Sequence, residues 1–205
     1  MNDVYTLPQL FTGHLLRVPD YQRGYAWEPK QCQELVEDVE ALPIGKRHHC
    51  GTLTLQKCPD RQVTDAAGNV YDVLDIVDGQ QRVTSLIILL DAIRRELETL
   101  GDQAAVRKAR GIRQTYIATE DSNLEPLPKL TLNSDCQPLF FTSILELAAA
   151  IDGPRIRSHE LLLAAKQHFA EYLQKQKAER GAEFGPWLEE LRVKLTQQLT
   201  FLMYP

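Results

Sequence analysis

The stretch that decides the fold is YDVLDIV-DGQQR-VTSLIILL, residues 71–90. Its first seven residues are rich in β-branched and apolar side chains and predict a strand. After Arg82 the apolar side chains repeat at helical spacing, which predicts a buried helix through Leu86, Leu89, Leu90, Ile93 and Leu97. The five residues between, Asp78 to Arg82, leave room only for a tight turn. The stretch therefore predicts a strand, a turn and a buried helix in direct succession.

The residues before this stretch predict a second strand and a helix. Thr52 to Gln56 alternates Thr and Leu as a strand does, and Asp65 to Asn69 has turn composition. We expect the two strands to pair as a hairpin, with Gly68 and Asn69 at positive φ. A helix is predicted from Pro29, with one apolar face, to Leu42 and Pro43.

The second half of the chain is mainly helical in its pattern. Helices are predicted from about Asp102 to Ile117, from Pro138 to Ile151, through Leu161 to Leu173, and through Trp187 to Leu195. The last segment, 199–205, alternates like a strand but has no evident partner strand, so we expect a truncated chain. The predicted fold is α/β (α+β): a small mixed sheet flanked by helices in residues 1–100, and a helical C-terminal extension in residues 101–205.

Composition limits the classes of function. Hydrophobic residues make up 43% and charged residues 25% of the 205, which is ordinary globular usage. The net charge of -5 argues against a protein whose whole surface binds nucleic acid, although a local basic groove stays open. Four cysteines without a C-x-x-C pair and no signal sequence predict a reduced, cytoplasmic protein. No apolar stretch approaches the roughly 20 residues that cross a bilayer, so no membrane partner is expected.

The turn Asp78-Gly79-Gln80-Gln81-Arg82 has the composition of an anion site. Backbone N–H groups at a helix N-terminus carry partial positive charge, a glycine lets the backbone approach a ligand, and Arg82 can bind phosphate through two parallel hydrogen bonds. Asp78 can hold a metal ion or a nucleotide hydroxyl. The alternative is purely structural: Asp78 caps the helix, Gly79 makes the turn and the amides are solvated.

A second cluster, residues 19–27, places Arg23 among the rings of Tyr21, Tyr25 and Trp27. Aromatic rings stack on bases and an arginine binds phosphate, so this composition suits a nucleotide. The alternative is that the three rings fill the core beneath the sheet.

Two further groups of residues are weaker candidates. His48, His49, Cys50 and Cys58 do not have the spacing of a common zinc site. Arg107, Lys108, Arg110 and Arg113 form a basic stripe that either meets DNA phosphates or is a solvated helix face.

The two main clusters together resemble the N-terminal domain of the GmrSD family of modification-dependent restriction enzymes. That family is related to ParB and sulfiredoxin folds and is found in SspE phage-defence proteins. The residues that carry the resemblance are Pro19, Tyr21, Gln22, Arg23, Tyr25 and Trp27, then Gly51, then Asp78, Gly79, Gln80, Gln81 and Arg82. The resemblance is strong over the first hundred residues and weaker at Lys129 to Asp135 and Ser158 to Leu173. The family's C-terminal HNH nuclease, and a segment with Asn and Gly after the last strand, have no counterpart here.

The resemblance implies binding and hydrolysis of a nucleoside triphosphate with Mg²⁺, as a regulatory step in DNA restriction against phage. It carries this activity onto Asp78, Gln80, Gln81 and Arg82. Because phosphoryl transfer needs charge stabilisation, an oriented water and Mg²⁺, we expect Asp78, Gln81 and Arg82 to be catalytic, with Asp78 also as the metal ligand. Nucleotide binding falls to Tyr21, Gln22, Arg23, Trp27, Gly79 and Gln80. There is no Walker-type phosphate loop, so a different cradle must hold the phosphates.

The expected partners are a nucleoside triphosphate and, for the full-length protein, DNA; a homo-oligomer stays open. Two rival interpretations remain: a DNA-recognition module for modified DNA without turnover of its own, and a scaffold whose motif only ties sheet to helix. The sequence decides neither the preferred nucleotide nor the DNA modification.

Overall fold

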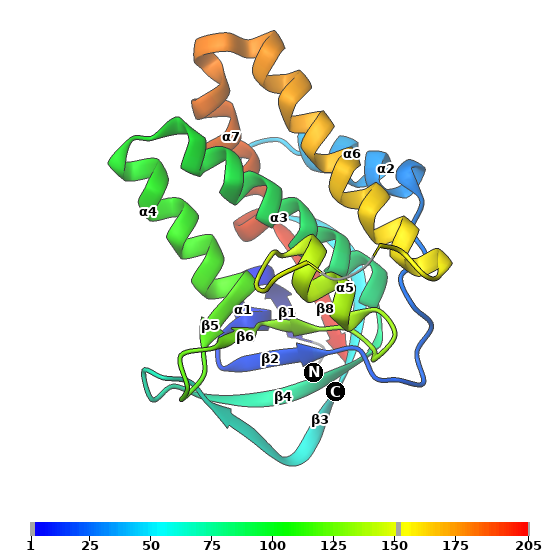
Figure 1. The fold of residues 1–205 in the computed structure, drawn as a ribbon. Coiled ribbons are helices and arrows are strands. Elements are labelled where there is room, and N and C mark those ends of the chain that lie inside the picture. Colours follow the sequence, from blue (N-terminus) through cyan, green and yellow to red (C-terminus); the bar gives the residue numbers. More distant parts are fainter. Residues whose placement is uncertain (1–2, 151–152, 205) are drawn as a thin grey trace.

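The computed structural model describes residues 3–150 and 153–204 (Figure 1). The strands are β1 (Asp3–Thr6), β2 (His14–Arg17), β3 (His48–Thr64), β4 (Val70–Asp78), β5 (Ala118–Glu120), β6 (Pro126–Pro128), β7 (Leu130–Thr131) and β8 (Leu199–Tyr204). The helices are α1 (Leu7–Phe11), α2 (Pro29–Glu40), α3 (Gln80–Leu100), α4 (Gln103–Ile112), α5 (Gln137–Leu139), α6 (Arg157–Arg180) and α7 (Phe184–Val193). Short π or 3-10 turns extend them: η1 (Arg113–Ile117), η2 (Phe140–Ile144), η3 (Gly181–Glu183) and η4 (Lys194–Gln198).

The main sheet is mixed and six-stranded, in the order β1-β8-β3-β4-β2-β7. Strands β2, β4 and β7 run parallel to one another, whereas β3 is antiparallel to β4 and parallel to β8. The predicted mixed sheet flanked by helices is therefore confirmed. The sheet takes β7 and β8 from the half of the chain that was predicted to be a helical extension.

The expectation that the last segment lacks a partner strand is wrong. Strand β8 lies inside the sheet, between β1 and β3, with Tyr5 opposite Phe201 and His48 opposite Leu199. The sequence did not reveal this pairing, because the partner strands lie about 150 or more residues away along the chain.

The hairpin of β3 and β4 forms as predicted, with a turn organised by a carboxylate. Gly68 has φ +85°, but Asn69 is not at positive φ; it instead donates its side-chain amide to Asp65 at 2.9 Å. The Asp65 carboxylate also accepts from the backbone N–H groups of Ala67 and Asn69, and from the hydroxyls of Tyr71 and Thr119. These hydrogen bonds, with the amide of Asn69 foremost, lower the pKa of Asp65 to about 2.

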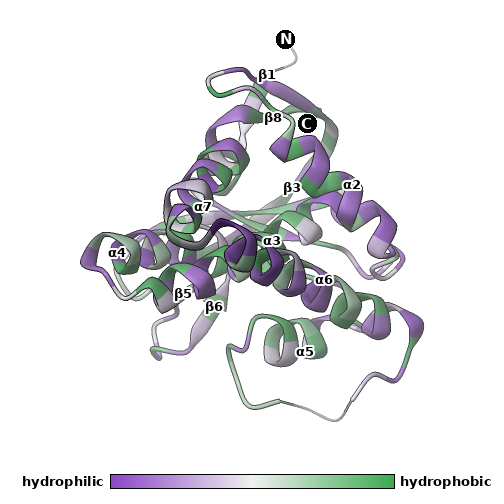
Figure 2. Cartoon of the chain, turned by 90° about the horizontal axis from the view of Figure 1, so that it is seen from above, coloured by the Kyte–Doolittle hydropathy of each residue, from purple (hydrophilic) through white to green (hydrophobic). Residues whose placement is uncertain are grey.

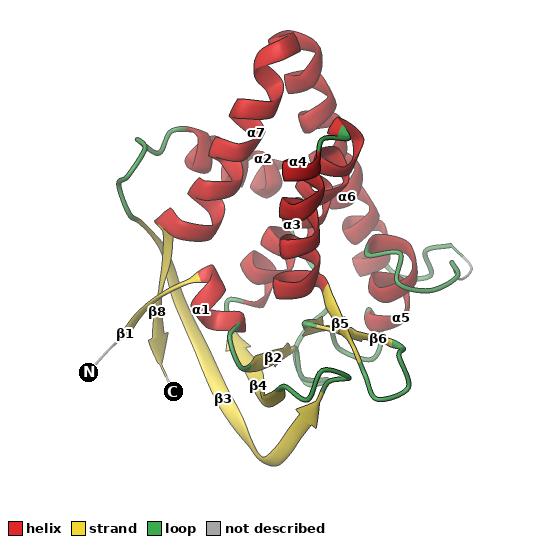
Figure 3. Cartoon of the chain, turned by 90° about the vertical axis from the view of Figure 1, so that its left-hand side faces the viewer, coloured by secondary structure: helices red, strands yellow, loops and turns green. Residues whose placement is uncertain are grey.

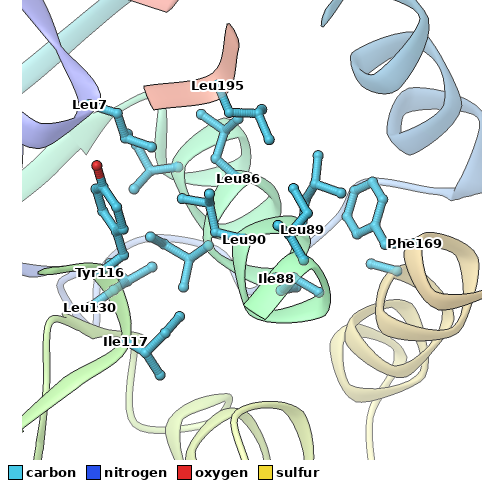
Figure 4. Close-up of a cluster of buried hydrophobic side chains, with 14 of the residues drawn as sticks. Leu7, Leu86, Ile88, Leu89, Leu90, Tyr116, Ile117, Leu130, Phe169 and Leu195 are labelled. Atoms are coloured by element: carbon cyan, nitrogen blue, oxygen red, sulfur yellow. The ribbon is translucent and has the colours of Figure 1, made fainter. Parts of the chain in front are cut away.

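Helix α3 is buried almost all round and forms the centre of the molecule. It packs against α4, α6, α7 and η1, and Figure 2 shows it between α4 and α6. The helices gather on one side of the sheet (Figure 3). Leu86, Ile87, Leu89 and Leu90 are all fully buried. Figure 4 shows Leu86, Leu89 and Leu90 among side chains from α1, η1, α6 and η4.

The region predicted as a helix from Pro138 to Ile151 is shorter in the structure. Helix α5 continues into η2 and ends at Ile144, and Glu146 has φ +53°. The Glu146 carboxylate binds Lys166 and Arg95 at 2.5 Å each, which anchors the chain in this non-helical conformation. Ile151 lies outside the described residues.

We predict that Asp65→Ala destabilises the fold in a pH-dependent way. The substitution leaves the N–H groups of Ala67 and Asn69 and the hydroxyl of Tyr71 without their acceptor. This loss lowers the free energy of unfolding by about 1–3 kcal/mol at pH 6. Because the folded pKa of Asp65 lies below the unfolded value of about 3.9, the stabilisation is complete above that value and is lost as pH falls toward 2. Urea unfolding of both proteins at pH 6, 4 and 3 measures this. Asp135→Ala is the control for size, because Asp135 is exposed and its carboxylate accepts no hydrogen bond in the described part of the chain. A stability difference between Asp65→Ala and the wild type that stays constant down to pH 3 contradicts the assignment.

Candidate functional site

The three parallel strands end at one place. At their carboxyl ends, β2 leads into the loop 18–28, β4 into the turn 78–82, and β7 into the turn 132–136. The carboxyl edge of parallel strands is where ligands bind in open α/β sheets. A cavity of about 400 Å³ opens there, which we call the motif cavity. Its lining residues are Gln22, Arg23, Trp27, Gly51, Thr52, Asp78, Gly79, Gln80, Gln81 and Arg82.

Two glycines make the close approaches that this cavity needs. Gly79 is the N-cap of α3 and has φ +91°, and a Cβ there would collide with the side chain of Leu53. Gly51 in β3 has φ +103°, and a Cβ there would lie 2.8 Å from Nη1 of Arg82. Gly51 therefore lets the guanidinium of Arg82 lie directly over the backbone of β3.

The glutamines of the two motifs bind each other and the backbone. Nε2 of Gln22 donates to the carbonyl of Val77 at 2.8 Å, and Nε2 of Gln80 donates to Oε1 of Gln22 and to the carbonyl of Arg23, each at 3.1 Å. Gln81 uses both ends of its amide: Oε1 accepts from the N–H of Ala26 at 2.7 Å, and Nε2 donates to the carbonyl of Gly24 at 3.2 Å. These contacts hold the loop 19–27 against the start of α3.

The loop is also tied to the turn after β7, a connection that sequence reasoning missed. Nδ2 of Asn133 donates to the carbonyl of Gln22 at 3.0 Å, and the N–H of Ser134 donates to the carboxylate of Asp20 at 2.7 Å. That hydrogen bond lowers the pKa of Asp20. Gly24 packs so closely on Ser158 of α6 that a Cβ would collide with it. Thr52 also lines the motif cavity without having been expected there.

Three charged side chains of the cavity are left free by these contacts. Among the described residues, Arg23, Arg82 and Asp78 have no hydrogen-bond or ion-pair partner for their side chains, and no side chain caps α3. Asp78 is exposed and does not cap the helix, so the purely structural interpretation of this aspartate is not what the structure shows. Two guanidinium groups and the positive end of a 21-residue helix thus face one cavity. This arrangement can bind an anion with several negative oxygens.

The three rings of the first motif lie in three different environments. Tyr25 is buried and its hydroxyl pairs with Ser85 at 2.7 Å; burial raises its pKa, so it belongs to the core. Tyr21 is 70% exposed and does not line the motif cavity. Trp27 is half-buried and lines it.

A second cavity of about 410 Å³ lies beside the first and shares Trp27, Gly51 and Arg82 with it. We call it the acidic cavity, because Glu34 and Asp38 of α2 line it. Cys50 is also in its wall, and burial raises the pKa of this thiol to about 11. The thiol is therefore protonated at neutral pH and adds no charge.

Of the weaker candidates of the sequence, His48, His49 and Cys50 line the acidic cavity. Within residues 3–150 and 153–204, no three His, Cys, Asp or Glu side chains are placed to share a metal ion. In the basic stripe, Lys108 pairs with Glu189 at 3.2 Å, and Nε of Arg107 donates to the carbonyl of Gln103. In the same described ranges, no helix has the length and apolar character needed to cross a membrane.

We predict that Gln81→Leu loosens the loop 19–27 without unfolding the protein. The N–H of Ala26 and the carbonyl of Gly24 lose their partners, which costs about 1–2 kcal/mol. Hydrogen exchange followed by mass spectrometry should then show faster exchange in the loop. Gln33→Leu, which removes a side-chain contact on α2, is the matched control. Unchanged exchange in the loop would show that Gln81 does not hold it.

A comparison with known proteins finds a matching family. The family profile described as "GmrSD restriction endonuclease, N-terminal domain" matches residues 7–200. No curated protein matches the chain. Because the match covers nearly the whole chain, from α1 to β8, the chain belongs to the family of GmrSD restriction endonuclease N-terminal domains.

Proposed function

We propose that this domain binds a nucleoside triphosphate with Mg²⁺ in the motif cavity and hydrolyses it as a regulatory step in DNA restriction. The observation that carries the proposal is the pair of unpartnered guanidinium groups, Arg23 and Arg82, facing the uncapped N-terminus of α3. Positive charge left unpaired in a cavity favours an anionic ligand, and helix N-termini are frequent phosphate sites.

The charges of the two cavities favour one orientation of the nucleotide. The phosphates would lie in the motif cavity, because both arginines and the α3 N-terminus line it. The base would lie toward the acidic cavity, where Glu34 and Asp38 would repel phosphate but can accept hydrogen bonds from a base. Trp27 borders both cavities and is placed to stack on the base or the ribose.

Hydrolysis would need a carboxylate for the metal ion and an oriented water. Mg²⁺ is commonly held by one or two carboxylates plus phosphate oxygens, and Asp78 offers one exposed carboxylate at the cavity edge. The ion would neutralise charge on the phosphates. Arg82 would stabilise the charge that develops on the transferred group. Gln80 and Gln81 would act by fixing the loop that carries Arg23, since their amides are bonded to that loop.

The second candidate function is recognition of modified DNA without turnover. The four basic residues of α4 and η1 are the feature that favours it. Against it stand the net charge of -5 and the pairing of Lys108 with Glu189. Nucleoside-triphosphate binding therefore has the stronger support.

We predict that Arg82→Ala abolishes or strongly weakens nucleotide binding in a folded protein. Removing a charge-assisted contact of about 1.5–3 kcal/mol weakens the affinity by about 10-fold to 100-fold. Calorimetric titration of ATP, GTP, CTP and UTP with Mg²⁺ measures it, beside Arg107→Ala on α4 as the matched control. If the wild-type chain binds none of the four, or if Arg82→Ala binds as well as the wild type, the nucleotide site is not here. Salt-dependent binding of modified DNA that survives Arg82→Ala would favour the DNA-recognition function.

We predict that Asp78→Asn separates binding from turnover. The substitution keeps the side-chain size but removes the negative charge that would hold Mg²⁺, so the nucleotide still binds with an affinity within about 3-fold of the wild type. Phosphate release falls by about 10-fold or more. A phosphate-release assay at saturating nucleotide, with and without Mg²⁺, measures this. Full turnover in Asp78→Asn would remove Asp78 from the catalytic assignment.

A further inference from the structure

A third cavity, of about 390 Å³, lies at the opposite ends of the same parallel strands. Gly13 precedes β2, Asn69 precedes β4 and Lys129 precedes β7, and all three line it. Strand β4 has nine residues, so at ~3.3 Å per residue this cavity and the motif cavity are about 26 Å apart. We call it the amino-end cavity. It is a separate place on the molecule, so a ligand there does not depend on the nucleotide site.

Lys129 gives this cavity its chemical character. Its side chain is 3% exposed, and within the described ranges its ammonium group donates no hydrogen bond to another residue. The ammonium nitrogen lies 3.7 Å from the centre of the Tyr71 ring, a cation–π contact that attracts the charge but accepts none of its three hydrogens as an oxygen would. Nζ itself is not completely enclosed within the described part of the chain, so it reaches the cavity, while burial of the side chain lowers the pKa of Lys129.

The nearest carboxylate does not satisfy the lysine. Asp65 lies close enough to favour the charged form of Lys129, but no hydrogen bond joins the two. The oxygens of Asp65 already accept five hydrogen bonds, from Ala67, Asn69 and Thr119 and from the hydroxyl of Tyr71. Lys129 is the one charged residue in the cavity lining, and no acidic side chain lines it within the described part of the chain.

Two neutral hydrogen-bonding side chains line the cavity together with Lys129. Gln114 and Thr115 of η1 line it, and neither side chain has a hydrogen-bond partner within the described residues. An amide, a hydroxyl and an ammonium group in one cavity lining supply the kinds of donor that bind an oxyanion group. Val70, which is 53% exposed, and the ring of Tyr71 offer an apolar surface for the rest of a small ligand.

We propose that the amino-end cavity binds a small molecule through one oxyanion group, phosphate or carboxylate, held by Lys129, Gln114 and Thr115. The experiment titrates inorganic phosphate, and separately acetate, into the isotope-labelled chain and follows backbone amide shifts, with glycerol as the neutral control. The expected result is saturable shifts at Gln114, Thr115 and Lys129 with at least one of the anions and none with glycerol. The anion that saturates them identifies the preferred group. No saturable shift with either anion overturns the proposal.

Two variants separate this cavity from the motif cavity. Lys129→Met keeps an unbranched apolar stem against Tyr71 and removes the charge, so the anion affinity read at these amides falls by about 10-fold or more. Arg82→Ala changes a residue of α3 at the carboxyl ends of the parallel strands and leaves that affinity unchanged. If Lys129→Met does not fold, the double variant Gln114→Ala, Thr115→Ala replaces it, and a several-fold loss is expected. Wild-type affinity in the folded variant, or a loss in Arg82→Ala as large as in Lys129→Met, contradicts the proposal.

Discussion

The structure depends on one constraint: strand β4 must turn at Gly79 directly into the helix α3, which is buried almost all round. The positive φ of Gly79 and its contact with Leu53 bring the helix start against β3, so that α3 lies on the sheet from its first turn. Helices α4, α6 and α7 then pack on α3, and α2 packs on α6. The same turn leaves the helix N-terminus uncapped and open to the motif cavity. The interaction that organises the core thus also creates the cavity that we propose to bind the anion.

Strand polarity explains why both ends of the sheet carry a cavity. The three parallel strands bring the motif loop, the Gly79 turn and the residues after β7 together at their carboxyl ends. Within the described residues, the charged groups that line the motif cavity are two arginines and an aspartate near a helix dipole, whereas Lys129 is the charged residue that lines the amino-end cavity. The motif cavity suits a ligand with several charges and a metal ion. The amino-end cavity suits a ligand with one negatively charged group.

The sequence predicted the strand, turn and helix of residues 71–97 because their periodicities are local. It also predicted that Arg23, Trp27 and Arg82 belong to one site, and the structure brings them together. It could not predict the position of β8, whose partners are distant in sequence, or the burial of Lys129, which depends on packing by η1 and Tyr71. The sequence also did not predict that Gln80 and Gln81 bind the backbone of the loop 19–27, because an amide beside a cavity can bind either backbone or ligand.

The division between ligand-facing and structural residues of the two motifs is the central claim. Arg23, Arg82, Asp78 and the first N–H groups of α3 face the cavity, while Gln22, Gln80, Gln81 and Tyr25 hold it together. The most direct test is a titration of the isotope-labelled chain with a non-hydrolysable nucleoside triphosphate and Mg²⁺, observed at the backbone amides and at Nε of the arginines. The account predicts saturable shifts at the amides of residues 79–82 and at Nε of Arg23 and Arg82. Shifts confined to α4 and η1, or an absence of shifts at residues 79–82, would contradict it.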